Sequence, residues 1–368
     1  MNVCILSMQR VDNMGSLLQA YALKTIIEKL GNNVEFIDII KREEDNVLLG
    51  DYRQEYNTEK EELGWIGKIK KLDCYTINRL KIKGKSKKQN GEFEKFRIKY
   101  LGIQKKSLKY DICIIGSDEV FNCLNSGTWG FTTQLFGKIP EADKIITYAA
   151  SCGSTTYSEL PEKIIERIKN AFENVEAFSV RDKNTREFVE KLTCKKVVDN
   201  LDPVLIYSFE KEMQQVSLPK VPEHYCVVYS YYNRVHTTEE ITAIEKFCEK
   251  YKLKPIAVGA PQFWIKDYIV CSPFQCLKIF EKADFVITDT FHGTIFASKF
   301  AKKFAILIRD SNRNKMSDLV KKIKKEDHLI ENMKEIETKY MLVKKEENFD
   351  DIVENESKRA LEYLKKNL

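Results

Sequence analysis

The sequence of 368 residues predicts an α/β protein with two Rossmann-like domains that face a cleft. Short apolar runs alternate with amphipathic segments along the chain, as in parallel sheets covered by helices. A proline-containing break near residues 205–222 separates two such sets, and the length suits two cores better than one. We therefore expect an N-terminal domain at residues 1–210, with a basic helical insertion at 41–106, and a C-terminal domain at 211–345. A last helix within 346–368 is expected to pack back on the N-terminal domain.

The first set of elements begins with a continuously apolar strand at residues 3–6. Residues 16–30 have the apolar spacing of an amphipathic helix, which Asn13 or Ser16 would cap. The stretch from 41 to 106 has a looser, charged pattern, which we interpret as helical. Further strands are expected at 34–39, 111–115, 144–149 and 177–180, and a further helix at 161–175.

The second set begins with a strand at residues 225–231, directly after the proline-containing break. A helical pattern at 238–251 follows, and alternation of the two element types continues to residue 308. The pattern predicts strands at 255–259, 269–271, 285–288 and 304–308, and helices at 274–282, 292–302 and 352–364.

Composition indicates a globular protein of the cytoplasm. Hydrophobic residues make up 43% and charged residues 32%, which is ordinary for soluble proteins. No apolar run approaches the roughly 20 residues that cross a membrane. The N-terminus lacks the basic start and apolar stretch of a signal peptide. The ten cysteines are scattered without a CxxC pair, so we expect buried free thiols and no metal site.

Two polar clusters follow predicted strands, where open α/β sheets bind ligands. In the first, Asn13, Gly15 and Ser16 begin a helix, so Gly15 allows a close backbone approach and the helix start attracts anions. An ordinary tight turn explains the same residues. In the second, Ser117 and Asp118 follow residues 112–115, and Asp118 and Glu119 are expected to be exposed at the sheet edge. The alternative there is a helix-capping box without function.

The third cluster surrounds His292, one of four histidines. Asp289, His292, Gly293 and Thr294 lie where the predicted strand 285–288 gives way to a helix. A titratable imidazole beside a helix N-terminus suits chemistry on an anionic substrate. A structural histidine is the alternative.

Arg181 directly follows the predicted strand 177–180. Its guanidinium can therefore reach the cleft and bind a carboxylate or phosphate through two hydrogen bonds. A local ion pair with Asp182 is the alternative.

The net charge of +6 is unevenly distributed. Lysine and arginine far outnumber acids between residues 68 and 106. A solvated helix face accounts for this pattern. The alternative is a surface for an anionic partner, either phospholipid headgroups or a diphosphate-linked acceptor. Nucleic acid is not expected, because no binding motif accompanies the basic run.

Six segments of the chain carry a resemblance to a known family, at residues 13–23, 116–122, 148–153, 179–182, 201–203 and 288–294. Together they resemble the polysaccharide pyruvyl transferase family, and they occur in the family's order over about residues 1–325. Two places depart from the family pattern. Glu119-Val120-Phe121 stands where Gln-Val-Trp is usual, and Cys152 stands where a Phe or similar residue is usual. A carboxylate at 119 beside an anionic donor is unfavourable unless it is paired.

The resemblance implies a fold of the GT-B glycosyltransferase type with the active site between the domains. It implies transfer of the pyruvyl group of phosphoenolpyruvate to sugar hydroxyls, with ketal formation, in cell-surface polysaccharide biosynthesis. No metal or organic cofactor is implied. His292 would be the general acid and Arg181 a donor-binding residue. The substrate-binding residues would be Asn13, Gly15, Ser16, Ser117, Asp118, Asp289, Gly293 and Thr294.

The expected partners are phosphoenolpyruvate and a saccharide acceptor. One option is an acceptor linked to a lipid diphosphate, and another is peripheral contact with the inner face of an anionic membrane. Two other functions stay open. One is a GT-B glycosyltransferase that uses a nucleotide sugar, and the other is a non-catalytic saccharide-binding protein. A helix N-terminus disfavours a protonated His292. We expect Asp289 or the donor's own charge to offset that effect.

Overall fold

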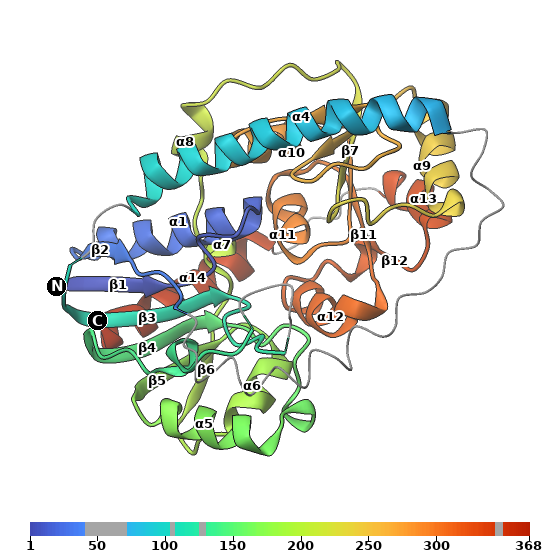
Figure 1. Cartoon of the computed structure of the whole chain (residues 1–368). Helices are drawn as coiled ribbons and strands as arrows, with labels where there is room; N and C mark the ends of the chain where they lie inside the picture. The colour runs from blue at the N-terminus through green and yellow to red at the C-terminus, as the bar shows by residue number, and fades with distance from the viewer. Residues whose placement is uncertain (41–71, 104–106, 125–129, 343–348) are drawn as a thin grey trace.

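Two six-stranded sheets lie side by side, one from each half of the chain (Figure 1). All pairings within both sheets are parallel. Helices pack on both sheets, so the predicted class of two Rossmann-like α/β domains is confirmed. The computed structural model describes residues 1–40, 72–103, 107–124, 130–342 and 349–368.

The N-terminal sheet has the strand order β2-β1-β3-β4-β5-β6. Its central strand β3 has a continuous apolar run because helices cover both faces of the sheet, and Cys113, Ile114 and Ile115 are fully buried. The strands are β1 (Asn2–Leu6), β2 (Asn33–Phe36), β3 (Tyr110–Asp118), β4 (Ala142–Ala150), β5 (Val175–Val180) and β6 (Val197–Asp199). The helices of this half are α1 (Met14–Lys29), α4 (Leu72–Phe96), α5 (Glu162–Phe172) and α6 (Lys183–Glu190).

The C-terminal sheet has the order β12-β11-β10-β7-β8-β9. Two short helices, α7 (Pro203–Ile206) and α8 (Glu210–Gln214), form the linker that precedes it. Its strands are β7 (Tyr225–Tyr229), β8 (Lys254–Val258), β9 (Asp267–Ile269), β10 (Phe285–Thr288), β11 (Phe304–Leu307) and β12 (Leu329–Ile330). Its helices are α9 (Thr238–Lys250), α10 (Pro273–Lys282), α11 (Phe291–Phe300), α12 (Arg313–Lys322) and α13 (Ile336–Tyr340), followed by α14 (Phe349–Asn367).

Three details differ from the sequence prediction. Strand β3 continues through Asp118, because Gly116 and Asp118 pair with β4 instead of forming a turn. The strand expected at 269–271 ends at Ile269, since Ser272 already caps α10. The two short edge strands β6 and β12 carry too few residues to show a pattern and were not predicted.

Helix α1 begins where the sequence predicts a cap. The Asn13 side chain accepts hydrogen bonds from the backbone N–H groups of Gly15 (2.7 Å) and Ser16 (3.4 Å). Eleven of its sixteen residues are buried, so the helix is covered on nearly all sides. This happens because α1 packs between its own sheet and helices α7 and α10.

One apolar core runs across both domains. Tyr21 of α1 packs edge-on against Phe274 of α10, with ring centroids 5.0 Å apart. Helix α4 reinforces this junction, since Phe96 at its end packs against Phe274, whereas Gln89 bonds the backbone of Cys271. Figure 1 shows α4 extending along both domains. The remainder of the basic insertion, at residues 41–71 and 104–106, lies outside the described residues.

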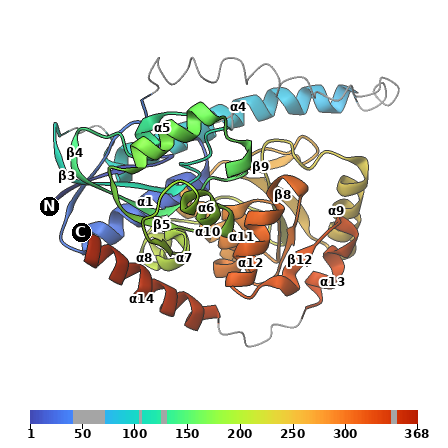
Figure 2. The same ribbon diagram turned by 90° about the horizontal axis from the view of Figure 1, so that it is seen from below.

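Helix α14 returns from the C-terminal domain to the N-terminal one (Figure 2). The Tyr363 hydroxyl donates a hydrogen bond of 2.8 Å to the Thr147 carbonyl of β4, and α14 also contacts α7. None of the described helices is long and apolar enough to span a membrane.

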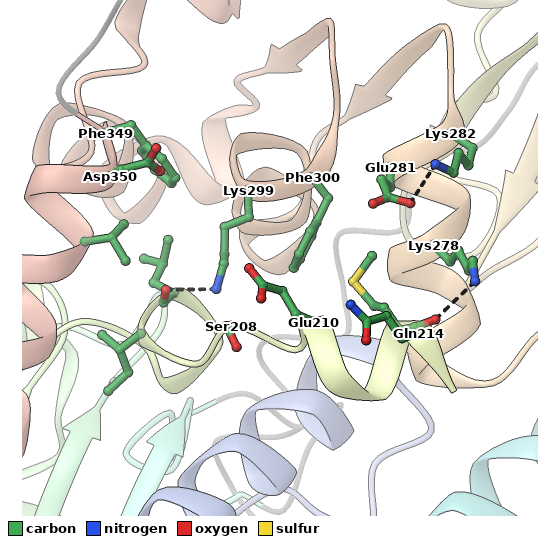
Figure 3. Close-up of a pocket in the computed structure, with 14 residues that line it drawn as sticks. Ser208, Glu210, Gln214, Lys278, Glu281, Lys282, Lys299, Phe300, Phe349 and Asp350 are labelled. Atoms are coloured by element: carbon green, nitrogen blue, oxygen red, sulfur yellow. Dashed lines mark hydrogen bonds and ion pairs between the residues drawn. The ribbon is translucent and has the colours of Figure 1, made fainter. Parts of the chain in front are cut away.

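Two lysines of the C-terminal domain hold the linker by its main chain. Lys299 donates hydrogen bonds to the carbonyls of Val204, Leu205 and Tyr207, at 2.8, 3.0 and 2.5 Å. Lys278 does the same for Met213 and Val216. Both lysines line a pocket of about 650 Å³ behind the linker, together with Glu210 and Asp350 of other elements (Figure 3).

Burial lowers the pKa of Lys299 to about 7, against the opposing effect of Asp202 and Glu210. Between pH 7 and pH 10 the unfolded chain therefore holds a proton that the folded chain lacks, so the free energy of unfolding rises with pH. We expect Lys299→Met to reduce this slope by up to about 1 kcal/mol per pH unit, measured by urea unfolding at several pH values.

Lys299→Arg is the control for this slope, because a guanidinium keeps the charge but does not titrate in this range. It should lose the slope as Lys299→Met does. An unchanged slope in both variants would show that Lys299 does not lose its proton near pH 7.

Candidate active site

Loops and helix starts at the carboxyl ends of β1, β3, β5 and β10 meet at the junction of the two domains. Helix α1 follows β1, Asp118 ends β3, Arg181 follows β5, and α11 follows β10. Gly15 of α1 lies against the His292 ring of α11, so the two helix N-termini touch across the junction. The sheets therefore direct their ligand-binding edges at one place, as parallel α/β sheets do.

Arg181 is fixed by two carboxylates and an aromatic ring. Its Nη1 donates a hydrogen bond of 2.8 Å to Asp202 Oδ2, and Nη2 lies 3.6 Å from Asp118 Oδ1. The guanidinium carbon lies 4.1 Å from the centre of the Phe291 ring, in a cation–π contact. Burial lowers the pKa of Arg181. The nearby carboxylates raise this pKa by a larger amount, so the net shift is upward. Arg181 is a permanent buried cation at the junction.

The local ion pair considered for Arg181 and Asp182 is not formed. Asp182 instead caps α6, accepting hydrogen bonds from the backbone N–H and hydroxyl of Thr185 at 2.8 and 2.7 Å. Its second oxygen accepts one from Ser151. Within the described residues, Arg181 Nε has no hydrogen-bond partner, although it is buried.

His292 lies in the first turn of α11, which Thr290 caps. Its Nε2 is 3.5 Å from Asp202 Oδ2, at the limit of a hydrogen bond, and has no other partner in the part of the chain described. Burial raises the pKa of Asp202. His292 and, to a smaller extent, Arg181 lower this pKa by more than burial raises it, so the carboxyl group is charged at neutral pH. Asp202 thus joins Arg181 and His292, and it supplies the negative charge beside the imidazole.

Asp289 or the donor's own charge was expected in that role, and the structure places Asp289 elsewhere. Its Oδ1 accepts a hydrogen bond of 2.6 Å from Ser230, and its Oδ2 one of 2.5 Å from Arg309. Its main-chain oxygen accepts another from Asn312. Asp289 is engaged by the ends of neighbouring strands, so it orders the C-terminal side of the junction.

The other expected site residues divide into two groups. Ser16 lies at the junction, where its hydroxyl donates a hydrogen bond of 2.7 Å to Asp118 Oδ2. Ser117 is instead turned under α1, where its hydroxyl bonds Gln19. Gly293 and Thr294 bond Thr290 within the start of α11 and are buried there. Asn13 contributes the α1 cap. The residues that converge are Gly15, Ser16, Asp118, Arg181 and His292.

Asp118 and Glu119 were expected to be exposed, and that prediction is wrong. Asp118 is 7% exposed, because Arg181 and Ser16 surround it. It adopts a left-handed backbone with φ of 77°, which aspartate tolerates better than most residues. The Glu119 side chain is 20% exposed and pairs with Lys315 of the other domain.

A small cleft of about 240 Å³ opens beside Phe291. Both domains line it, and we call it the interdomain cleft. Its residues are Glu119, Asn122, Ser154, Tyr231, Arg234, Phe291, Asn312 and Lys315. The larger pocket at Lys299 lies at the other end of α11 from His292. In the described residues, no group of three His, Cys, Asp or Glu side chains could hold a metal ion.

Gly15 allows the two domains to come together. A Cβ on Gly15 would lie closer than 3.0 Å to Cγ and Nδ1 of His292. We expect Gly15→Ala to lower the free energy of unfolding by about 1–3 kcal/mol through overpacking. Alanine is a better helix former than glycine by about 1 kcal/mol, so helix propensity alone predicts the opposite sign. Urea unfolding measures the difference.

Gly91→Ala in α4 is the matched control, since a Cβ there meets nothing within 4 Å. It should leave stability unchanged or raise it. A Gly15→Ala protein as stable as the Gly91→Ala protein would contradict the close contact of α1 with His292.

Comparison with known proteins gives two results. The sequence model of the polysaccharide pyruvyl transferase family matches residues 13–311 of this chain. No curated protein matches the chain.

Three solved structures are similar to this chain at low sequence identity. UDP-GlcNAc 2-epimerase from Methanocaldococcus jannaschii is similar with a TM-score of 0.52, 11% identity and 100% coverage of both chains. Its complex with UDP-GlcNAc and UDP gives a TM-score of 0.51 at 13% identity, with 99% of this chain and 100% of that chain covered. Arabidopsis thaliana UGT89C1 with UDP-L-rhamnose gives 0.45 at 13% identity, with 99% of this chain and 94% of that chain covered.

The similarity to the epimerase identifies a fold of the GT-B type, as the resemblance implied. The family match covers most of the chain and includes the segments that contain Arg181, Asp202 and His292. The chain belongs to the polysaccharide pyruvyl transferase family.

Proposed function

We propose that this protein transfers the pyruvyl group of phosphoenolpyruvate to two hydroxyls of a saccharide, forming a ketal and releasing phosphate. Family membership supports the class of reaction. The observation that carries the proposal is the Arg181–Asp202–His292 group at the contact of two domains. It combines a permanent cation, which suits an anionic donor, with a titratable group for proton transfer.

The reaction needs one proton delivered to carbon and two oxygen–carbon bonds formed. His292 would give a proton to the methylene carbon of the donor, which becomes a methyl group and leaves a positive centre at the neighbouring carbon. One acceptor hydroxyl adds there, and its proton restores the protonated form of His292. The second hydroxyl then displaces phosphate and gives the ketal, and its proton leaves with the phosphate.

The surroundings of His292 fit the acid role. A helix N-terminus opposes positive charge, and the dipole of α11 acts on His292 in that sense. The Asp202 carboxylate, 3.5 Å from Nε2, stabilises a positive charge on the ring. Asp202 is itself held by Arg181, so its position is set by the N-terminal domain.

Arg181 fits the donor-binding role. Its guanidinium is held between Asp202 and Asp118, and its buried Nε–H has no partner among the described residues. Buried donors are nearly always bonded, so an unpartnered one favours a ligand at this place. A carboxylate or phosphate of the donor would complete that bond.

A glycosyltransferase that uses a nucleotide sugar is the second candidate. The epimerase of similar fold is solved with UDP-GlcNAc and UDP. A pocket of about 440 Å³ in the C-terminal domain offers space, between the start of α9 and the end of β11. Four carboxyl groups line it, and three of them are paired with the cations Arg309, Arg313 and Lys334 of the same pocket. These cations are already neutralised, so the described residues of the pocket offer no free positive charge that marks a diphosphate site, and this candidate has less support.

Purified protein incubated with phosphoenolpyruvate and a panel of saccharides tests the proposal. We expect phosphate release that depends on the acceptor, with the ketal detected by mass spectrometry. A parallel set with nucleotide sugars follows the release of nucleoside diphosphate. Release in that set alone would replace our proposal with the second candidate.

A further inference from the structure

An ion pair crosses the interdomain cleft. Glu119 follows β3 in the N-terminal domain, and Lys315 lies on α12 of the C-terminal domain. Lys315 Nζ donates a hydrogen bond of 2.6 Å to Glu119 Oε1, and Asn122 donates one of 2.7 Å to Oε2. Both charged side chains line the cleft and are largely shielded from water, with 20% and 14% of their side-chain surface exposed.

Both groups of the pair are charged at neutral pH. Burial raises the pKa of Glu119, but Lys315, followed by Arg181, lowers it to about 2. Burial lowers the pKa of Lys315, and Glu119 more than reverses that effect, so the net shift is upward. The carboxylate of Glu119 thus interacts with two cations, Lys315 from one domain and Arg181 from the other. The same two cations would stabilise a bound carboxylate or phosphate at this place.

Glu119 stabilises the positive charge of Lys315. In the described part of the chain, Glu119 is the one hydrogen-bond acceptor of Lys315 Nζ. A largely shielded ammonium that loses its partner is destabilised, so an anion that takes the place of Glu119 would restore the lost interaction. The Asn122 amide can hold Glu119 on the N-terminal side after that exchange.

We propose that Lys315 is an anion-binding residue of the interdomain cleft and that Glu119 occupies its subsite until an anionic ligand displaces it. The inference rests on the proposed function only in so far as the ligand is phosphoenolpyruvate. Glu119 therefore weakens ligand binding in two ways, by competing for Lys315 and by repelling the incoming anion.

Glu119→Gln separates these roles from a structural one. Glutamine has the same size and still accepts the Asn122 hydrogen bond, but it does not pair with Lys315 as an ion. We expect the free protein to unfold at a lower temperature and yet to bind phosphoenolpyruvate about tenfold more tightly. Opposite changes in stability and affinity are not expected if Glu119 only supports the fold.

Isothermal titration of the full chain with phosphoenolpyruvate, and separately with inorganic pyrophosphate, gives the affinities. Glu187→Gln is the matched control, because it makes the same change of net charge at an exposed site on α6. It should bind as the wild type does. Lys315→Gln should weaken binding about tenfold, and the gain from Glu119→Gln should be largely lost in the double variant.

Glu119→Asp keeps the charge on a shorter side chain, so it should bind phosphoenolpyruvate no more tightly than the wild type. If Glu119→Gln does not fold, Glu119→Asp takes its place in the comparison. Lys315→Gln must then still bind the anion more weakly than the wild type. Equal phosphoenolpyruvate binding by wild type, Glu119→Gln and Lys315→Gln would overturn the subsite and leave the donor proposal intact. Tighter pyrophosphate binding by Glu119→Gln, without phosphoenolpyruvate binding to any protein, would support the subsite and contradict the donor.

Discussion

Replacement of His292 by glutamine is expected to lower the rate of phosphoenolpyruvate-dependent phosphate release by a factor of about 10²–10⁴. This is the usual contribution of a positioned general acid. Glutamine is close to histidine in size and polar, but it has no proton to give at neutral pH. The fold should persist, since the Nε2 atom of His292 has no hydrogen bond within the described residues.

Steady-state rates at saturating donor measure this loss, with urea unfolding as the test of the fold. His224→Gln is the control, because the His224 side chain is 63% exposed and lies beside Asp284, away from the junction. It should retain the wild-type rate. Full activity in the His292→Gln protein would show that another group delivers the proton.

The second large effect is expected for Asp202→Asn, which should lower the free energy of unfolding by about 3–5 kcal/mol. Asparagine still caps α7, because its amide oxygen can accept the hydrogen bond from Val204. The loss therefore reports on charge. Of its two ion pairs Arg181 would keep the longer one, with Asp118 at 3.6 Å, and His292 would lose its carboxylate. Phosphate release should fall as well.

Asp182→Asn is the matched control for stability. Asp182 is also a buried carboxylate that caps a helix, but within the described residues it forms no ion pair. We expect it to cost about 1 kcal/mol. Equal losses in the two variants would mean that the contacts of Asp202 with Arg181 and His292 add nothing to stability.

The pKa of Asp202 determines how the stability of the fold changes at acid pH. Its pKa in the folded protein lies below its ordinary value of 3.8. Its contribution to stability is therefore present above that value and is lost as the pH falls below it. Between pH 5 and pH 2 the wild type should lose more stability than the Asp202→Asn protein, and acid titrations of both proteins measure the difference.

Local sequence patterns predicted the fold well. The Asn13 cap, the apolar strand 285–288 and the helix after it depend on neighbours in the chain, and the structure has all three. Arg181 at the end of a strand could be recognised in the same way. Short edge strands were missed, because a strand such as β12 has only two residues.

The partners of the site residues could not be predicted from local patterns. Asp202 precedes a proline, and that pair is also an ordinary helix-cap signal, so its contact with His292 has no local sign. Lys315 lies on a charged helix and meets Glu119, 196 residues away. Ser117 was expected to bind ligand, but it bonds Gln19, since hydroxyls also serve to pair buried polar groups.

The continuous core beneath the junction has a consequence for the thermodynamics of binding. Tyr21 and Phe274 are packed in the free protein, so the domains have already lost their freedom to rotate against each other. A ligand does not have to supply that entropy, and its binding can be governed by desolvation and by local rearrangement of side chains. Such a protein should bind its donor with a small change in heat capacity, since little new apolar surface is buried.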